Sequence, residues 1–224
     1  MMRVGKFAFL ALVICLAPAE ARERGHLIPV EPTFDVKGPY AKTYARLREE
    51  KLFAGPNWVL RYHSSSNVEL GVSISKRQDG KYWVTVKQAK PPLPSILALA
   101  RNQKWNLQWA LNTVEFHQAH AEVPETTVES ILDYSLSLLT DVRPLPQSLS
   151  PMVISNKVTL FAKAPRGRVL EGQLPPDAAK YRHIYAVEDI VDDLVGICAE
   201  PQENHDVVFR HIEEKARRFS RGEH

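Results

Sequence analysis

Residues 68–87 read VELGVSISKRQDGKYWVTVK, and this stretch decides the fold. Apolar and polar side chains alternate in two runs, at residues 68–75 and 81–87. A period of two is typical of a strand that packs one face on a core. Asp79 and Gly80 stand between the runs, and Asp-Gly is a strong signal for a tight hairpin turn. The stretch therefore predicts two antiparallel strands with one face buried and the other face in water.

The same alternation begins earlier in the chain, and a segment with a helical pattern precedes it. Residues 58–63 also alternate, so residues 57–89 predict a three-stranded antiparallel meander. Its first turn falls at residues 64–67, which are three serines and an asparagine, all common in turns. Upstream, residues 39–55 have the spacing of a short amphipathic helix with a proline at its start.

The central part of the chain favours one more strand and a helix. Residues 107–123 alternate like a strand with one slip of register, whereas residues 96–101 fit either a helix or a strand. Pro124 is suited to the start of a helix, and the apolar residues from Val128 to Leu139 then trace one helical face. That helix is expected to face the core.

The last third of the chain predicts a second hairpin and another helix. Residues 152–154 and 158–161 flank a short polar turn, and residues 172–176 read as irregular. An apolar face recurs from Val187 to Cys198. We therefore expect an α+β fold, in which an antiparallel sheet of about five or six strands, a meander plus a second hairpin, packs against two to three helices.

The N-terminus has the pattern of a cleaved secretory signal. Arg3 and Lys6 precede an apolar run, and Ala19 and Ala21 occupy the positions that a signal peptidase reads. The run is too short to span a bilayer, so we expect no transmembrane segment in the mature chain. We predict a periplasmic or secreted protein with a signal peptide at 1–21, an extended lead-in at 22–38, a single α+β domain at 39–199 and a charged C-terminal helix at 200–224.

Charge and cysteine content exclude several classes of function. Cleavage after residue 21 would lower the formal net charge from +3 to +2, which is far from the concentrated basic surface that nucleic acid requires. Ile14 stands where a lipid-attachment signal at Cys15 needs a small residue, so cleavage is preferred to a lipid anchor. Cys198 is then left alone on an apolar helix face and is expected to be an inert thiol. No cofactor is predicted.

Residues 115–122, EFHQAHAE, raise the question of a metal site. In a strand, His117 and His120 point to opposite faces and cannot close on one ion. The helical zinc motif needs histidines four apart with a glutamate next to the first, and Gln118 occupies that place. We interpret the stretch as a strand; the alternative is a metal-assisted hydrolase that uses His117, His120 and Glu122.

The order of elements resembles that of exported bacterial α+β proteins of unassigned function. The resemblance covers residues 57–199 and rests on the strand that ends at Val123-Pro124, the helix to Leu139, the strand at 158–161, Gly167 and the helix at 187–198. It carries no diagnostic catalytic motif. Some proteins of this kind neutralise secreted toxins, so the resemblance implies that an inhibitory role is possible for this chain.

These observations favour protein binding over catalysis. The chain contains no Gly-x-Ser-x-Gly elbow and no glycine fingerprint for a nucleotide. We expect a non-enzymatic exported binding protein, an inhibitor or immunity-type partner of another exported protein. Its binding surface is expected on the solvent face of the sheet, at Arg61, His63, Lys81 and Trp83. A structural envelope component is a further alternative that fits the basic C-terminal helix.

Overall fold

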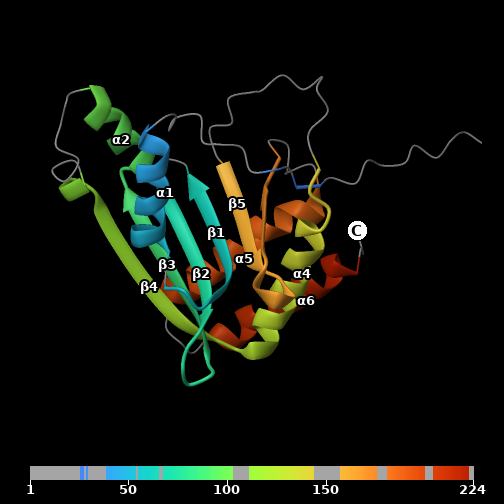
Figure 1. Cartoon of the computed structure of the whole chain (residues 1–224). Coiled ribbons are helices and arrows are strands. Elements are labelled where there is room, and N and C mark those ends of the chain that lie inside the picture. Colours follow the sequence, from blue (N-terminus) through green and yellow to red (C-terminus); the bar gives the residue numbers. More distant parts are fainter. Residues whose placement is uncertain are drawn as a thin grey trace, which may run out of the picture.

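The computed structural model describes residues 26–27, 29, 39–53, 55–65, 68–102, 111–143, 157–175, 181–199 and 204–221. The described residues form an α+β fold, a six-stranded antiparallel sheet with helices on both faces (Figure 1). The predicted fold class is therefore confirmed. The expected signal peptide lies outside the described residues, as does the lead-in except for His26, Leu27 and Pro29.

The sheet has the strand order β4-β3-β2-β1-β5-β6. Its strands are β1 (Trp58–Ser65), β2 (Glu69–Lys76), β3 (Tyr82–Lys90), β4 (Glu115–Val123), β5 (Lys157–Lys163) and β6 (Val169–Gln173). The meander β1-β2-β3 is as predicted, and Asp79-Gly80 makes the β2–β3 turn. Gly80 has a φ of 83°, which costs a glycine little, and Asp79 accepts a hydrogen bond from the Lys81 amide at 3.0 Å.

The second hairpin was predicted with the wrong partner. Residues 152–154 lie outside the described residues, and β5 pairs instead with β1 on one side and β6 on the other. A 3-10 turn at Pro165–Gly167 joins β5 to β6. Gly172 and Gln173, expected to be irregular, belong to β6. Strand pairing depends on residues distant in the sequence, which the local alternation does not reveal.

The predicted strand at 107–123 is shorter than expected. Residues 107–110 lie outside the described residues, Leu111 and Asn112 are helical, and β4 begins at Glu115. Residues 96–101, which fitted either a helix or a strand, are helical and belong to α2 (Leu93–Asn102). The prolines that follow β3 have no amide hydrogen to continue the pairing, so the strand ends and the chain turns into that helix.

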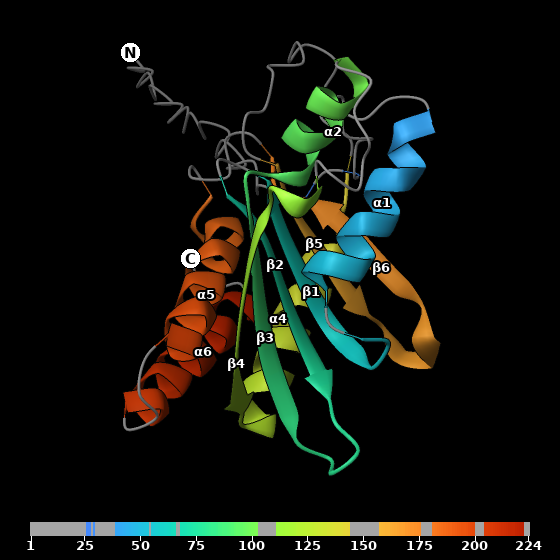
Figure 2. The same ribbon diagram turned by 90° about the vertical axis from the view of Figure 1, so that its left-hand side faces the viewer.

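The inner face of the sheet carries the main hydrophobic core. The helices over it are α4 (Glu125–Leu139), α5 (Arg182–Ala199) and α6 (His205–Ser220), and Figure 2 shows them on the side of the sheet away from α1. The apolar faces predicted for 124–139 and 187–198 are the buried ones. Leu27 from the lead-in is also fully buried in this core. No helix among the described residues is long and apolar enough to span a bilayer.

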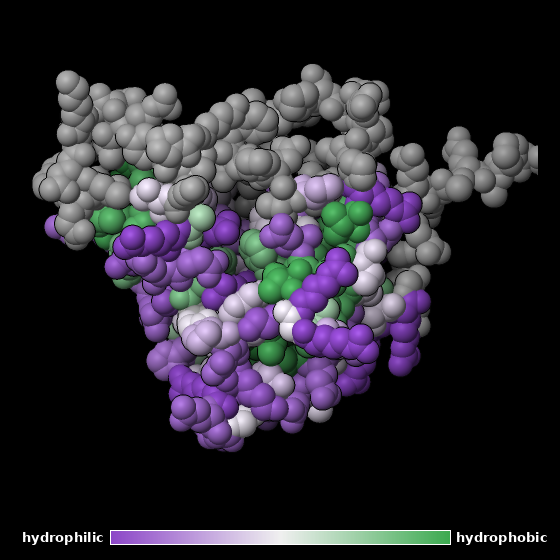
Figure 3. Space-filling model, viewed as in Figure 1, coloured by the Kyte–Doolittle hydropathy of each residue, from purple (hydrophilic) through white to green (hydrophobic). Residues whose placement is uncertain are grey.

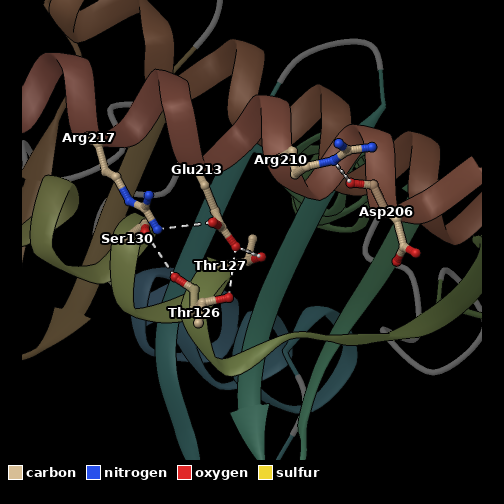
Figure 4. Close-up of polar contacts among 7 residues, drawn as sticks. All are labelled: Thr126, Thr127, Ser130, Asp206, Arg210, Glu213 and Arg217. Atoms are coloured by element: carbon tan, nitrogen blue, oxygen red, sulfur yellow. Dashed lines mark hydrogen bonds and ion pairs between the residues drawn. The ribbon is translucent and has the colours of Figure 1, made fainter.

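The charged C-terminal helix α6 docks on α4 and α5. Its apolar face, with Phe209, Ile212 and Ala216, is buried. Glu213 reaches the first turn of α4 and accepts hydrogen bonds from the hydroxyls of Thr126 and Thr127, each at 2.8 Å (Figure 4). Because helix N-termini favour negative charge, this carboxylate also suits the dipole of α4.

The outer face is not left in water, contrary to the prediction. Helices α1 (Pro39–Leu52) and α2 cover one half of it, so Glu69 and Ser73 are fully buried although they are polar positions of the alternation. The close approach of α1 to the sheet depends on Gly71, because a Cβ atom there would lie 2.4 Å from the Leu52 carbonyl oxygen. The other half, toward the β2–β3 turn, lies beyond α1 (Figure 2).

Candidate functional site

The covered half of the outer face holds a buried polar cluster. Glu69 accepts hydrogen bonds from the Tyr44 hydroxyl at 2.6 Å and from the Leu93 amide at 2.8 Å, and His63 Nε2 lies 2.8 Å from the same carboxylate. These groups come from β2, α1, α2 and β1. All three side chains are buried. The cluster therefore links both outer helices to the sheet and offers little access to a ligand.

Arg61 joins the end of α1 to the sheet. Its guanidinium donates to Glu49 at 2.7 Å and to the Gly55 carbonyl at 3.2 Å, and it lies 4.6 Å from the centre of the Phe53 ring and 4.5 Å from that of Trp58. Burial lowers the pKa of Arg61, and Glu49 opposes that shift. The arginine is thus engaged within the fold.

The open half holds two tryptophans in one row, of which Trp58 is buried and Trp83 is half-buried. Trp58 pairs with Ser75, and Ser75 pairs with Trp83, so the three residues lie side by side across β1, β2 and β3. We call Trp58, Ser75 and Trp83 the tryptophan row. An irregularity of register between Trp58 and Leu60 turns Trp58 to the outer face, where simple alternation had placed it inward.

Cations cover both aromatic rings of this row. The Arg77 guanidinium stacks 3.7 Å from the centre of the Trp83 ring, and Lys163 Nζ lies 4.7 Å from that of Trp58. His120 packs beside Trp83, with ring centres 5.4 Å apart. The Trp83 Nε1 donor is shielded from solvent and has no hydrogen-bond acceptor among the described residues. Such a donor is rare in folded proteins.

A shallow hollow lies next to the tryptophan row. It has a volume of about 500 Å³ and is lined by residues 55–57 and 75–79. Arg77 is exposed there and forms no ion pair within the described part of the chain, and the Lys163 ammonium donates to the Pro56 carbonyl at 2.8 Å. In the space-filling view of the outer face, hydrophilic side chains dominate this end of the sheet (Figure 3). The hollow is thus lined by polar and charged side chains, among them Arg77, which stacks on the neighbouring Trp83 ring.

The residues predicted as a binding surface share the outer face but do not form one cluster. Arg61 and His63 are buried beneath α1. Trp83 is half-buried in the open half, and Lys81 lies near it with its ammonium 2.8 Å from Glu122. That hydrogen bond raises the pKa of Lys81.

Sequence reasoning missed three members of the open half, Trp58, Arg77 and Lys163. Arg77 lies two residues before Asp79-Gly80, so its position near the turn could be predicted from the sequence. Its stacking on Trp83 was not, because a hairpin pattern does not specify side-chain direction outside the strands. Lys163 reaches Trp58 only through the pairing of β5 with β1.

The strand predicted for EFHQAHAE is confirmed as β4. Its pairing with β3 places His120 opposite Thr85 and Glu122 opposite Trp83 on the outer face, while His117 points to the inner face. The three residues of the hydrolase alternative therefore do not converge. No group of three or more histidine, cysteine or acidic side chains within the described ranges could hold a metal ion.

Helix α5 carries a set of acidic side chains and a cysteine, Cys198. Burial raises the pKa of Glu188 and of Asp192, and neighbouring carboxylates add to both shifts. Asp193 is 3.3 Å from the Lys215 ammonium of α6, which ties the acidic face to the C-terminal helix. Burial raises the pKa of the Cys198 thiol to about 11, so it is protonated and unreactive at neutral pH.

No family model, curated protein or solved structure matches this chain. The site is therefore interpreted from its own geometry. Its strongest features are the stacked Arg77–Trp83 pair and the hollow beside it.

Proposed function

We propose that this chain is a non-enzymatic binding module that docks on another exported protein through the exposed Arg77 and the half-buried Trp83 on which it stacks. The observation that carries the proposal is the stack of the exposed Arg77 guanidinium 3.7 Å from the Trp83 ring. Tryptophan and arginine are the residues most enriched among those that dominate binding energy at protein interfaces.

The charge of the site identifies the kind of partner surface. Arg77 and Lys163 both lie beside tryptophan rings and have no carboxylate within ion-pair distance in the described part of the chain. A stacked guanidinium keeps its edge N–H groups available for bidentate contact with a carboxylate. The complementary surface is therefore an acidic segment, and an inhibitory or immunity-type role follows if that segment belongs to a partner's active region.

The shape of the site supports a protein rather than a small molecule. The hollow is open and shallow, and it lies between the segment before β1, the end of β2 and the β2–β3 turn. Pockets for small ligands enclose most of the ligand surface, whereas a protein interface needs a broad area around a few anchors.

The test begins with a photocrosslinker in place of Gln78, at the rim of the hollow, in cells that produce the chain. The captured protein is then purified, and its affinity is measured by calorimetry for the wild type, Arg77→Glu and Arg46→Glu. Arg46 is the matched control, since its side chain is 77% exposed on α1 and does not line the hollow.

We expect Arg77→Glu to weaken binding by at least about 30-fold, the loss of an interface anchor, and Arg46→Glu to leave it unchanged. Binding should also weaken with added salt. Equal affinities for both variants would refute the proposed site, and a partner that binds only the unfolded chain would refute the function.

A further inference from the structure

Strand β4 is an edge of the sheet and is unusually open. It pairs with β3 over all nine residues without a break in register, and no described strand lies on its other side. The opposite edge strand, β6, has only five residues. Figure 2 looks onto β4, with α5 and α6 to one side and α1 to the other.

The side chains of β4 are exposed on both faces of the sheet over its first half. Residues 115–118 are all exposed, and Phe116 keeps 39% of its surface in contact with solvent. The exposed part of this aromatic ring lies on an edge that no described strand covers. It is therefore available to a neighbouring strand.

Natural proteins normally protect such an edge. They shorten it, bend it with a bulge, or place lysine or proline on it, because unpaired amide and carbonyl groups recruit other strands. The middle of β4, residues 116–121, reads FHQAHA and contains no lysine, arginine, carboxylate, proline or glycine. Its regular register also shows no bulge.

We propose that β4 pairs antiparallel with β4 of a second copy of this chain, so that two six-stranded sheets become one continuous sheet. The two-fold axis passes through Ala119, which then faces Ala119 of the second copy. This interface borders the site of the proposed function, because Glu122 lies opposite Trp83 and His120 packs against its ring, but the proposal does not rest on that function.

The proposed register avoids repulsion between like charges. It places Phe116 opposite Glu122, His117 opposite Ala121 and Gln118 opposite His120, so no two like charges face each other. Cross-strand neighbours of this kind determine the stability of a strand pair. The Gln118 amide can also form a hydrogen bond with the His120 ring.

The neighbouring symmetric registers are less favourable. A shift of the axis to His120 sets the two His120 rings against each other and pairs only residues 117–123. A shift to Gln118 pairs only residues 115–121. The register centred on Ala119 is the one that pairs all nine residues of both strands.

The decisive experiment compares two substitutions at one exposed position. Phe116→Glu places a carboxylate opposite Glu122 of the other copy, and Phe116→Lys places an ammonium there; both remove the same aromatic surface. Sedimentation equilibrium of the full chain would give the dimer dissociation constant of each variant. Glu171→Lys, on the opposite edge strand, is the control.

We expect a wild-type dimer, and a dissociation constant higher by on the order of tenfold for Phe116→Glu than for Phe116→Lys, since the contact occurs twice. Glu171→Lys should match the wild type. A monomeric wild type overturns the proposal, as does a dimer that responds equally to both substitutions at Phe116.

A crosslink tests the register itself. In a Cys15→Ser, Cys198→Ser background, Ala119→Cys should form a disulfide between copies on mild oxidation, because directly opposed residues in an antiparallel pair have Cα atoms about 4.5 to 5.5 Å apart. Glu115→Cys should not, because the two positions lie at opposite ends of the paired strands. The reverse result overturns the proposed pairing.

Discussion

His63 and Glu69 face each other beneath α1, with Nε2 of the histidine 2.8 Å from Oε1 of the glutamate and neither side chain more than 4% exposed. The same carboxylate accepts hydrogen bonds from Tyr44 and from the backbone at the start of α2. One buried acid thus holds four elements together. Burial of a carboxylate is tolerated because each of its oxygens has a partner.

Tyr44→Phe should lower the free energy of unfolding by about 1.5 to 3 kcal/mol, since it removes a hydrogen bond to a buried carboxylate. Urea denaturation would measure the change. Tyr185→Phe is the control, because Tyr185 is 42% exposed and should change stability little. Equal stabilities for wild type and Tyr44→Phe would show that the hydroxyl contributes nothing.

Gly71→Ala should destabilise the fold by about 1 to 3 kcal/mol or more, as expected for overpacking, because its Cβ would collide with the Leu52 backbone. Gly196→Ala provides the contrast. Nothing lies within 4 Å of a Cβ at Gly196, which is in helix α5, so alanine there should stabilise by about 0.5 to 1 kcal/mol. Thermal unfolding of both variants would check the opposite signs.

Ile212→Ala should lower the free energy of unfolding by about 2 to 5 kcal/mol, because α6 contributes this fully buried side chain to the main core. Val207 lies on the same helix with 64% of its surface exposed, and Val207→Ala should be close to neutral. If both variants unfold at the same urea concentration, α6 is not part of the cooperative unit.

Alkaline pH should destabilise the protein. Burial raises the pKa of Cys198 from 9.0 to about 11, so the unfolded chain loses this proton at lower pH than the folded one. The stability from the protonated thiol is complete below about pH 9 and is lost as pH rises toward about 11. Tyr62 and Tyr134, whose pKa values burial also raises, act in the same direction.

Urea denaturation at a series of pH values from neutrality upward would measure this loss. Cys198→Ala should reduce the slope of stability against pH just above about pH 9, where the tyrosines contribute least. An unchanged slope in that variant would assign the alkaline loss to other groups.

The candidate site was only partly readable from the sequence. Trp83 and Lys81 were placed on the outer face correctly, because the period of two on either side of the Asp79-Gly80 turn fixes which side chains share a face. Arg61 and His63 share that face too. Their burial depends on α1, which local alternation does not position, and Trp58 joined them only through an irregularity of register.

The sequence by itself determined the hairpin, the meander and the buried faces of α4 and α5, because backbone geometry imposes periods of two and 3.6 residues within each segment. The tertiary structure alone decided that β5 lies between β1 and β6, that α1 and α2 cover half of the outer face, and that β4 is an edge strand among the described residues. These arrangements depend on contacts between segments far apart in the chain. No local periodicity records which distant segment will cover a given face or pair with a given edge.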